Sequence, residues 1–431
     1  MYARRSASIV QSWAAHDICL AMTDPQAPSY RGRDFLVFLA CRFLATSAMQ
    51  VLSVAVGWQI YAIARDPLAL GLVGLSQFVP MFLLTLPAGD IADRVDQRLI
   101  YALALGVAAL CGVLLLVLSL GHPAATWPIY TILALFGAAR GFTGPAATSL
   151  LAFLVPMERL PKAIGWNSTA FQTAVIAGPA LGGFLYVLGP VTAYAVCAAC
   201  FLGAALGVTT LGGRRRMVEP AGGTTALSRV SEGVRFVRTR PVVLGALSLD
   251  LFAVLLGGAV ALLPAFARDI LHVGPQGLGL LRSAPAVGAA LMAIAFGRRP
   301  LERHAGRMMF GAVVLFGVAT IVFGLSTNFL LSLAALFVLG ASDMVSVFIR
   351  ASLVQIATPD AMRGRVSAVN MLFIGASNEL GEFESGLTAS WWGTVPAVIV
   401  GGLGTLVVVA IWMWGFPPLR KIDRLTDVAP N

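Results

Sequence analysis

The sequence predicts an all-α membrane protein with twelve transmembrane helices in two six-helix pseudo-symmetric halves. Three observations predict this fold class: an apolar composition, a regular series of long apolar segments, and a sequence repeat that relates the two halves. Hydrophobic residues make up 58% of the chain and charged residues 12%, whereas soluble domains contain about 25% charged residues. The composition therefore excludes a soluble globular protein.

Long apolar segments recur along the whole chain. A helix needs roughly 20 apolar residues to cross a hydrocarbon core of ~30 Å. Twelve segments meet this requirement, near residues 34–62, 68–88, 99–120, 127–154, 163–188, 190–211, 242–266, 275–296, 308–325, 329–350, 366–389 and 393–416.

The longest polar stretch between these segments divides the chain. We predict that it includes a short amphipathic helix on the membrane surface. The first 33 residues contain no continuous apolar core followed by a small-residue cleavage site, so we expect no signal peptide. The predicted organisation is a tail at 1–33, a first half at 34–211, a central loop at 212–241, a second half at 242–418 and a tail at 419–431.

The basic residues are distributed unevenly. The net charge is +10, but most Lys and Arg fall in the tails and in alternate loops, and only Arg65 and Arg268 fall in the opposite loops. This asymmetry follows the positive-inside rule and predicts that both termini and the central loop are cytoplasmic. The basic excess therefore reflects topology, and we expect no nucleic-acid partner.

The two halves repeat each other. Ala64-Arg65-Asp66 recurs as Ala267-Arg268-Asp269, 203 residues later. Gly74 and Pro80 recur as Gly279 and Pro285, 205 residues later. At the first of these shifts, Gly137, Pro156, Asn167, Gly178 and Gly183 recur as Gly340, Pro359, Asn370, Gly381 and Gly386. A parallel repeat of six helices predicts a substrate site at the interface of the halves.

The repeat also aligns charged residues inside the helices. Arg140 in the fourth segment corresponds to Asp343 in the tenth, so we expect these two to face each other across a central cavity. Asp250 in the seventh segment lies at a depth similar to that of Arg42 in the first. An ionised side chain at mid-membrane costs at least ~2.5 kcal/mol, so each should face a partner or a wet cavity.

The eleventh segment contains three acids, Glu379, Glu382 and Glu384, where the first half is apolar. Glu379 and Glu382 share one helix face, and Glu384 points elsewhere. An acid in hydrocarbon is retained where it is paired or where it titrates. We predict Glu382 as a proton carrier and Glu379 as a relay, with Asp343 as the next candidate. The alternative is that these acids only form hydrogen bonds between helices.

Two motifs are typical of transporters. The charged stretch Gly89–Arg98 between two apolar segments has the pattern Gly-x-x-x-Asp-Arg, with Asp93 and Arg94 at its end and a base, Arg98, at the tenth position. The fifth segment contains Gly178-Pro179-Ala180-Leu181-Gly182-Gly183. Small residues let helices approach closely, and Pro179 weakens the local hydrogen bonding, so this segment is either a packing seam or a bendable joint.

Over about residues 34–420 these features resemble the major facilitator superfamily. The first motif resembles its signature loop between helices 2 and 3, although the eighth position, usually Gly, is Asp96. The second resembles the Gly-Pro-x-x-Gly-Gly signature of its exporter (antiporter) branches. Glu232–Val237 and Leu263–Phe266 resemble the branch of the bacterial enterobactin exporter. The resemblance implies alternating access, with Asp93 and Arg94 latching the cytoplasmic side closed against the inner end of helix 11.

No feature of the sequence indicates an enzyme. There is no Gly-x-Ser-x-Gly motif and no phosphate-binding loop. Cys197-x-x-Cys200 lies in an apolar segment, where packing residues are expected, and the four His residues are scattered. We therefore expect no catalytic residues, no metal site and no cofactor.

The sequence predicts a secondary active transporter, specifically a proton-coupled exporter of a siderophore-like or drug-like compound. A facilitated uniporter or importer is the alternative, and a membrane-embedded sensor is the alternative from another class. The expected partners are the lipid bilayer, a small-molecule substrate and protons. The expected form is a monomer in the bacterial cytoplasmic (inner) membrane.

Overall fold

Helices account for nearly all of the described chain. The computed structural model describes residues 32–121, 123–212, 226–299 and 303–428, apart from the side chains of residues 86–94, 226–230, 360, 361, 368, 426 and 428. The first half consists of α2 (Gly32–Ala64), α3 (Pro67–Arg94), α4 (Gln97–Leu120), α5 (Trp127–Leu154), α6 (Leu160–Val187) and α7 (Pro190–Thr209).

The second half begins after a separate helix, α8 (Ala226–Thr239). Its first span joins α9 (Pro241–Leu256), the 3-10 turn η1 (Ala259–Leu262), α10 (Leu263–Ala265) and the π turn η2 (Phe266–Ile270). The remaining spans are α11 (Pro275–Arg298), α12 (Ala305–Leu325), α13 (Phe329–Ala357), α14 (Asp360–Trp392) and α15 (Thr394–Gly415), followed by α16 (Pro417–Lys421) and η3 (Leu425–Val428).

These elements form twelve spans, as the sequence predicts. Ten are long and apolar enough to cross a membrane by length and composition, counting Pro241–Ile270 as one. The other two, α5 and α14, are also long, but they contain Arg140 and the acids Glu379, Glu382 and Glu384. These two spans are long enough to cross a membrane, and they fall short of the other ten on apolar composition and charge rather than on length.

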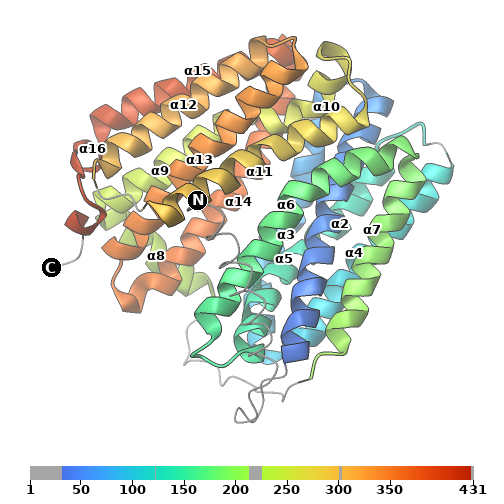
Figure 1. Ribbon diagram of the computed structural model, residues 1–431, viewed down its shortest axis with the longest axis horizontal. Helices are drawn as coiled ribbons and strands as arrows, with labels where there is room; N and C mark the ends of the chain where they lie inside the picture. The colour runs from blue at the N-terminus through green and yellow to red at the C-terminus, as the bar shows by residue number, and fades with distance from the viewer. Residues whose placement is uncertain (1–31, 122, 213–225, 300–302, 429–431) are drawn as a thin grey trace, which may run out of the picture.

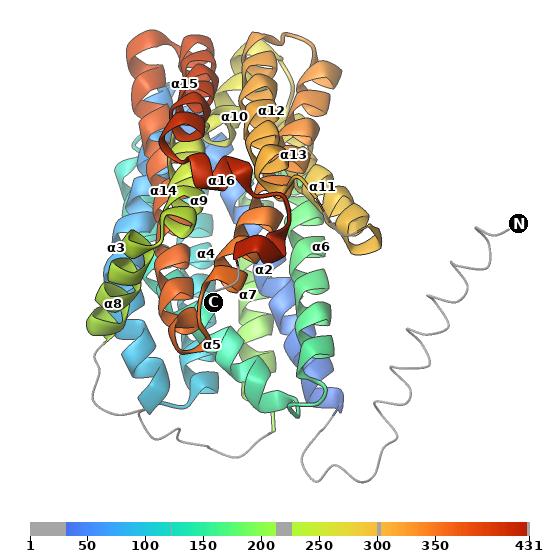
Figure 2. The same cartoon turned by 90° about the vertical axis from the view of Figure 1, so that its left-hand side faces the viewer.

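The spans pack as two groups of six (Figure 1). In the first, α2 packs on α6 and α7, α3 on α5, and α4 on α5 and α7. In the second, α11 packs on α13, α12 on α13 and α15, and α9 on α14 and α15. Figure 2 shows α8 beside α3 and α14, at the end of the molecule opposite α10 and the α14–α15 turn.

Two helix pairs make the largest contacts between the halves, α6 with α11 and α3 with α14. At both contacts glycines allow the backbones to meet. A Cβ on Gly279 would lie 3.1 Å from the Cα of Gly183, and a Cβ on Gly386 would lie 2.7 Å from the Cα of Gly71. Small residues are what such close packing of membrane helices requires. We call these two contacts the glycine seams.

The molecule has two distinct ends. At the Tyr61 end, α2 meets α3, α6 meets α7 and α14 meets α15; at the Arg98 end, α3 meets α4 and α13 meets α14. In Figure 1 the two groups come together at the upper right, near α10, and diverge toward the lower left.

The connection between α3 and α4 is shorter than expected. The sequence suggests a charged turn at Gly89–Arg98, but α3 continues as a helix to Arg94, because no residue between Gly89 and Arg94 breaks it. Only Val95 and Asp96 connect the helices. Asp96 is the N-cap of α4, since its side chain accepts a hydrogen bond of 3.0 Å from the backbone N of Arg98.

The seventh span is interrupted, which the continuous apolar segment 242–266 did not predict. α9 ends at Leu256, and the chain changes direction at Gly257 and Gly258 before η1 begins. Backbone atoms of α14 crowd this break, since a Cβ on Gly258 would lie 3.1 Å from the carbonyl carbon of Gly381. The break therefore lies directly beside the position of Glu382.

Candidate functional site

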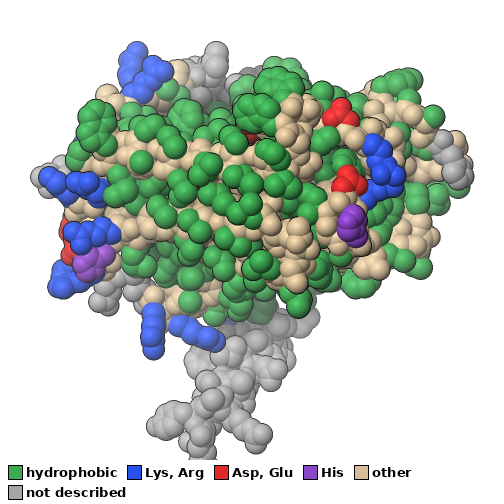
Figure 3. Space-filling model, turned by 90° about the horizontal axis from the view of Figure 1, so that it is seen from above, with side chains coloured by type: hydrophobic (Ala, Val, Ile, Leu, Met, Phe, Trp, Pro, Cys, Tyr) green, Lys and Arg blue, Asp and Glu red, His purple; other side chains and the backbone are tan. Residues whose placement is uncertain are grey.

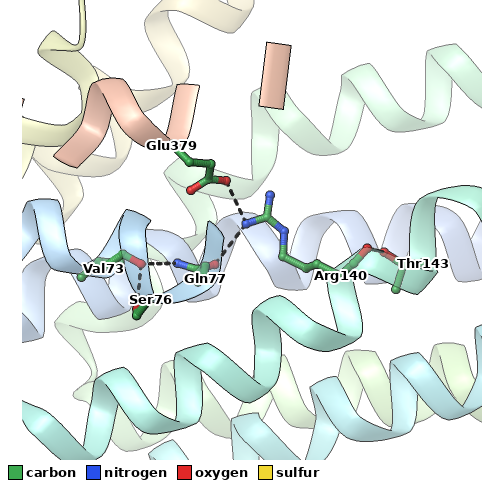
Figure 4. Close-up of polar contacts among 6 residues, drawn as sticks. All are labelled: Val73, Ser76, Gln77, Arg140, Thr143 and Glu379. Atoms are coloured by element: carbon green, nitrogen blue, oxygen red, sulfur yellow. Dashed lines mark hydrogen bonds and ion pairs between the residues drawn. The ribbon is translucent and has the colours of Figure 1, made fainter. Parts of the chain in front are cut away.

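A cluster of charged side chains lies between the halves, and Arg140 is at its centre (Figure 4). Arg140 of α5 places its guanidinium 3.2 Å from a carboxylate oxygen of Glu379 on α14. The same nitrogen donates a 3.1 Å hydrogen bond to the side-chain oxygen of Gln77 on α3. The Arg140 and Glu379 side chains are 27% and 12% exposed. The pair therefore bridges the two halves in partial contact with solvent.

Gln77 is held in the orientation that this contact needs. Its amide nitrogen donates to the backbone oxygen of Val73 at 3.3 Å, which leaves the amide oxygen directed at Arg140 (Figure 4). The sequence contained a signal for Gln77 that was missed. The shift that relates Gly74 to Gly279 also relates Gln77 to Arg282, so Gln77 is the first-half counterpart of a charged residue.

Glu382 lies one helical turn from Glu379 on the same face of α14. It packs against Gly74 of α3, where an added Cβ would lie 2.8 Å from its carboxylate oxygen. Arg282 of α11 interacts electrostatically with both Glu382 and Glu379. The cluster thus contains two arginines and two glutamates, with Arg140 from the first half and the other three from the second.

This arrangement can respond to movement of the halves. An ionised carboxylate in a membrane needs a partner, and the alternative to a partner is a proton. Because Arg140 and Glu379 lie on different halves, any motion that separates α5 from α14 removes a partner from Glu379. The cluster can therefore couple binding of protons or of a charged ligand to the relative position of the halves.

Asp343 does not face Arg140, contrary to the expected pairing. Asp343 of α13 lies instead near Asp250 of α9, beside one small cavity inside the second half. Asp250 forms a 3.0 Å ion pair with Arg350, whose guanidinium also donates to Asn370 at 3.1 Å. The repeat matched the depth of Arg140 and Asp343, but the face of α13 that bears Asp343 also bears Arg350, two turns further along, and is turned toward α9.

Two other predicted residues lie away from the cluster. The guanidinium of Arg42 on α2 lies 5.4 Å from the ring centre of Phe171 on α6, so Arg42 belongs to the interior of the first half. Glu384 lies next to Ser385 and off the face that Glu379 and Glu382 share.

The residues of the expected latch are only partly described. The side chains of Gly89, Asp93 and Arg94 lie outside the described part of the chain. Arg98 binds its own half, since its guanidinium donates a 2.5 Å hydrogen bond to the backbone oxygen of Leu211 after α7.

The glycine-proline motif of α6 packs on both sides. A Cβ on Gly178 would lie 2.6 Å from Gln50 of α2, and a Cβ on Gly182 would lie 2.9 Å from Val51. Gly183 and the backbone of Pro179 face α11 and form one of the two glycine seams. The motif therefore joins α2 to α11, across the boundary between the halves.

A second bridge between the halves, not expected from the sequence, lies at the Tyr61 end. The hydroxyl of Tyr61 on α2 donates to the carboxylate of Asp269 in η2. One residue earlier, the guanidinium of Arg268 lies 5.9 Å from the ring centre of Trp58. Asp269 is the repeat counterpart of Asp66, and Tyr61 is the counterpart of Pro264. Because Pro264 has no hydroxyl group, it cannot donate the equivalent hydrogen bond to Asp66.

Comparisons with known proteins agree with this architecture. Residues 24–430 match a family described as transmembrane secretion effector. The enterobactin exporter EntS of Citrobacter koseri is 27% identical over 430 residues, covering 97% of this chain and 99% of the relative. EntS of Shigella boydii serotype 18 is 26% identical over 421 residues, covering 96% and 97%.

Solved structures with the same fold are also transporters. A mutant of the nucleoside transporter NupG gives a TM-score of 0.71 at 14% identity, covering 89% of this chain and 100% of that one. A bacterial homologue of the human lysosomal transporter Spinster, inward-facing and occupied, gives 0.70 at 14% identity, covering 90% and 97%. The chain therefore belongs to the transmembrane secretion effector family of the major facilitator superfamily, and it is a multi-pass membrane transporter.

Proposed function

We propose that this transporter is a proton-coupled exporter of a small organic compound, siderophore-like or drug-like, that works by alternating access in the bacterial cytoplasmic membrane. The observation that supports this most is the ion pair between Arg140 and Glu379, because it joins the two moving halves through a group that can bind a proton. The sequence relatives named as enterobactin exporters favour export and a siderophore-like substrate.

We infer that the described conformation is the one that opens toward the cytoplasm. The positive-inside rule assigns the Arg98 end, with most of the Lys and Arg, to the cytoplasm, and with it both termini. The halves touch at mid-depth and at the Tyr61 end, through Arg140, the glycine seams and the bond from Tyr61 to Asp269. Rocking the halves would separate them at these contacts, which opens the Tyr61 end, and would bring them together at the Arg98 end.

Coupling follows from the cluster on α14. When the Tyr61 end opens, α14 moves relative to α5 and Glu379 loses Arg140. Protons from outside then bind Glu382, with Glu379 as relay, and neutralise the face of α14. After the return to the cytoplasm-open state, Arg140 and Arg282 again face the carboxylates and displace the protons inward, while substrate binds from the cytoplasm.

The central test is Glu382→Gln in proteoliposomes. This change fixes the neutral form at nearly constant volume. A pH difference of one unit can drive about tenfold accumulation per coupled proton. We expect Glu382→Gln to reduce pH-driven accumulation of substrate to a ratio near one, while substrate binding and energy-independent exchange persist. The measurement is transport with and without a pH gradient across a panel of siderophores, including enterobactin, and lipophilic cations.

Glu384→Gln is the matched control, because it makes the same chemical change on α14 away from the cluster, and it should transport as the unaltered protein does. Normal uphill transport by both Glu382→Gln and Glu379→Gln would exclude α14 as the proton site. Asp343 would then be the next candidate for the residue that binds the proton. If Asp343→Asn also transports normally against a gradient, the proton site lies outside these three acids. If the unaltered protein shows no accumulation driven by the pH gradient, it is a facilitated uniporter or importer.

A second prediction concerns the Tyr61 end. Tyr61→Phe removes the hydrogen bond to Asp269 and leaves the ring in place. A hydrogen bond to a charged group contributes about 1.5–3 kcal/mol, so the population open at this end should rise about tenfold or more. Val54→Cys, at a fully buried position of α2 that packs against second-half residues such as Leu262, should then react faster with an impermeant maleimide in a cysteine-free background.

Tyr130→Phe controls for the loss of a phenol, since the Tyr130 hydroxyl bonds Ala69 within the same half at 3.1 Å. Equal labelling rates in the two variants would show that the Tyr61 bond does not hold the halves together.

A further inference from the structure

A groove outside the charged cluster runs along the outer side of the second half, at the Arg98 end. It has a volume of about 750 Å³ and lies between the beginning of α12 and the ends of α15 and α16. Its deeper wall is apolar and includes Gly311 and Val314 of α12 and Met413 of α15. Its rim contains Arg307, Arg420 and Lys421, all exposed.

The rim is fixed by the fold of the C-terminal segment. The first backbone N–H groups of α12, at Ala305 and Gly306, donate to the backbone oxygens of Asp423 and Ile422 at 3.0 and 3.1 Å. Gly306 has no side chain, and the backbone of Arg420 takes that space. Leu419 and Ile422 are buried beneath it. The chain that bears Arg420 and Lys421 is therefore docked onto α12.

The charge of the rim is not neutralised within the described chain. The acid at the groove, Asp423, accepts a 3.0 Å hydrogen bond from the backbone N of His304 and lies 3.8 Å from the His304 ring. No ion pair to Arg307, Arg420 or Lys421 occurs among the residues that the structure describes. In Figure 3, Lys and Arg side chains and a His gather at the left edge, the side on which α16 lies in Figure 1, beside a broad hydrophobic surface.

The groove crosses the level at which a membrane changes from polar to apolar. Trp414, near the end of α15, is 85% exposed, and exposed Trp marks the membrane interface. The basic rim lies around this level. Val314 lies seven residues beyond Arg307 on α12, about 10 Å along the helix axis toward the hydrocarbon core. The groove thus offers cations at headgroup depth and an apolar wall at acyl-chain depth.

We propose that this groove is a binding site for an anionic phospholipid. The phosphodiester would be held by Arg307, Arg420 and Lys421, since guanidinium groups bind phosphate oxygens in pairs. An acyl chain would lie along Gly311, Val314 and Met413. Gly311 leaves room for it, because nothing lies within 4 Å of a Cβ added there. Basic pockets beside transmembrane helices are sites of this kind.

The test uses the purified full chain in nanodiscs of phosphatidylcholine with a minor fraction of phosphatidylglycerol. Native mass spectrometry after release into detergent counts the retained lipids. We expect about tenfold enrichment of phosphatidylglycerol over its share of the bilayer. The triple variant Arg307→Gln, Arg420→Gln, Lys421→Gln should lose this enrichment. Gly311→Trp, which fills the apolar wall and keeps the charges, should also lose it, and Gly311→Leu replaces it if the Trp variant fails to fold.

The control triple Arg238→Gln, Arg298→Gln, Arg299→Gln removes the same charge from other exposed positions at this end. It should retain the enrichment. Equal loss in the two triples would mean general surface attraction and would overturn the proposal. A different result would also overturn the proposal: inorganic phosphate at millimolar concentration displaces the lipid, and Gly311→Trp keeps the enrichment. The groove would then be a site for free anions.

Discussion

Arg350→Ala should lower the free energy of unfolding by about 3–5 kcal/mol, the usual cost of removing one partner of a buried ion pair. The Arg350 and Asp250 side chains are only 5% and 9% exposed, and they lie 3.0 Å apart. Arg350 also donates to Asn370 on α14, so its loss leaves a carboxylate and an amide without a partner in the core of the second half. Asp343 lies close by and adds a second acid to the stranded charge.

Thermal unfolding in detergent, followed by Trp fluorescence, measures this effect. Arg299→Ala is the control, because Arg299 is exposed beyond α11 and should change the unfolding midpoint little. The double variant Arg350→Ala, Asp250→Ala should be more stable than Arg350→Ala alone, since a lone buried charge is the expensive species. Strictly additive losses would show that the two residues do not stabilise each other.

The sequence predicted the fold well because membrane helices follow simple rules. The length of an apolar segment must match the bilayer, and each backbone polar group must be satisfied within the helix. Even α5 and α14, which contain Arg140 and the three glutamates, were recognised as spans from the length of their apolar segments. The repeat also predicted two halves, since matched positions such as Gly183 and Gly386 imply matched packing.

The partners of the charged residues were harder to predict. The repeat relates equivalent positions, but it does not determine which side chains meet. Arg140 was expected to face its counterpart Asp343, yet it binds Glu379, because α14 lies against α3 and directs its acids toward α5. The two halves differ in sequence at this site. The second half has Glu382 where the first half has Pro179, and Arg282 where the first half has Gln77.

Two local features, a break in a helix and a hydrogen bond between helices, could not be predicted from the sequence. The break at Gly257 and Gly258 depends on the neighbouring α14, and the bond from Tyr61 to Asp269 depends on how α2 and η2 meet in this conformation. Both are tertiary effects. The first depends on packing within the second half, and the second on contact between the halves.

Gly183→Val should have the largest effect on transport, because it acts on a seam between the halves. A Cβ at this position would lie 3.0 Å from the Cα of Gln276 and 3.1 Å from the Cα of Gly279, both on α11. Overpacking of this kind costs about 1–3 kcal/mol. Moving α6 away from α11 relieves the overlap, so the cost falls only on the described conformation. A bias of that size changes the ratio of two states by about 5–150-fold.

We therefore expect Gly183→Val to favour the conformation open at the Tyr61 end and to slow alternation at least about fivefold. Spin labels at position 188, directly after α6, and at position 391 of α14 are both exposed at that end and should move apart in electron–electron distance measurements. Gly203→Val is the matched control, because it makes the same change in a transmembrane helix where nothing lies within 4 Å of the new Cβ. If Gly183→Val kept the short distance and normal transport, α6 and α11 would not separate during the cycle, and the proposed opening of the halves at this seam would be wrong.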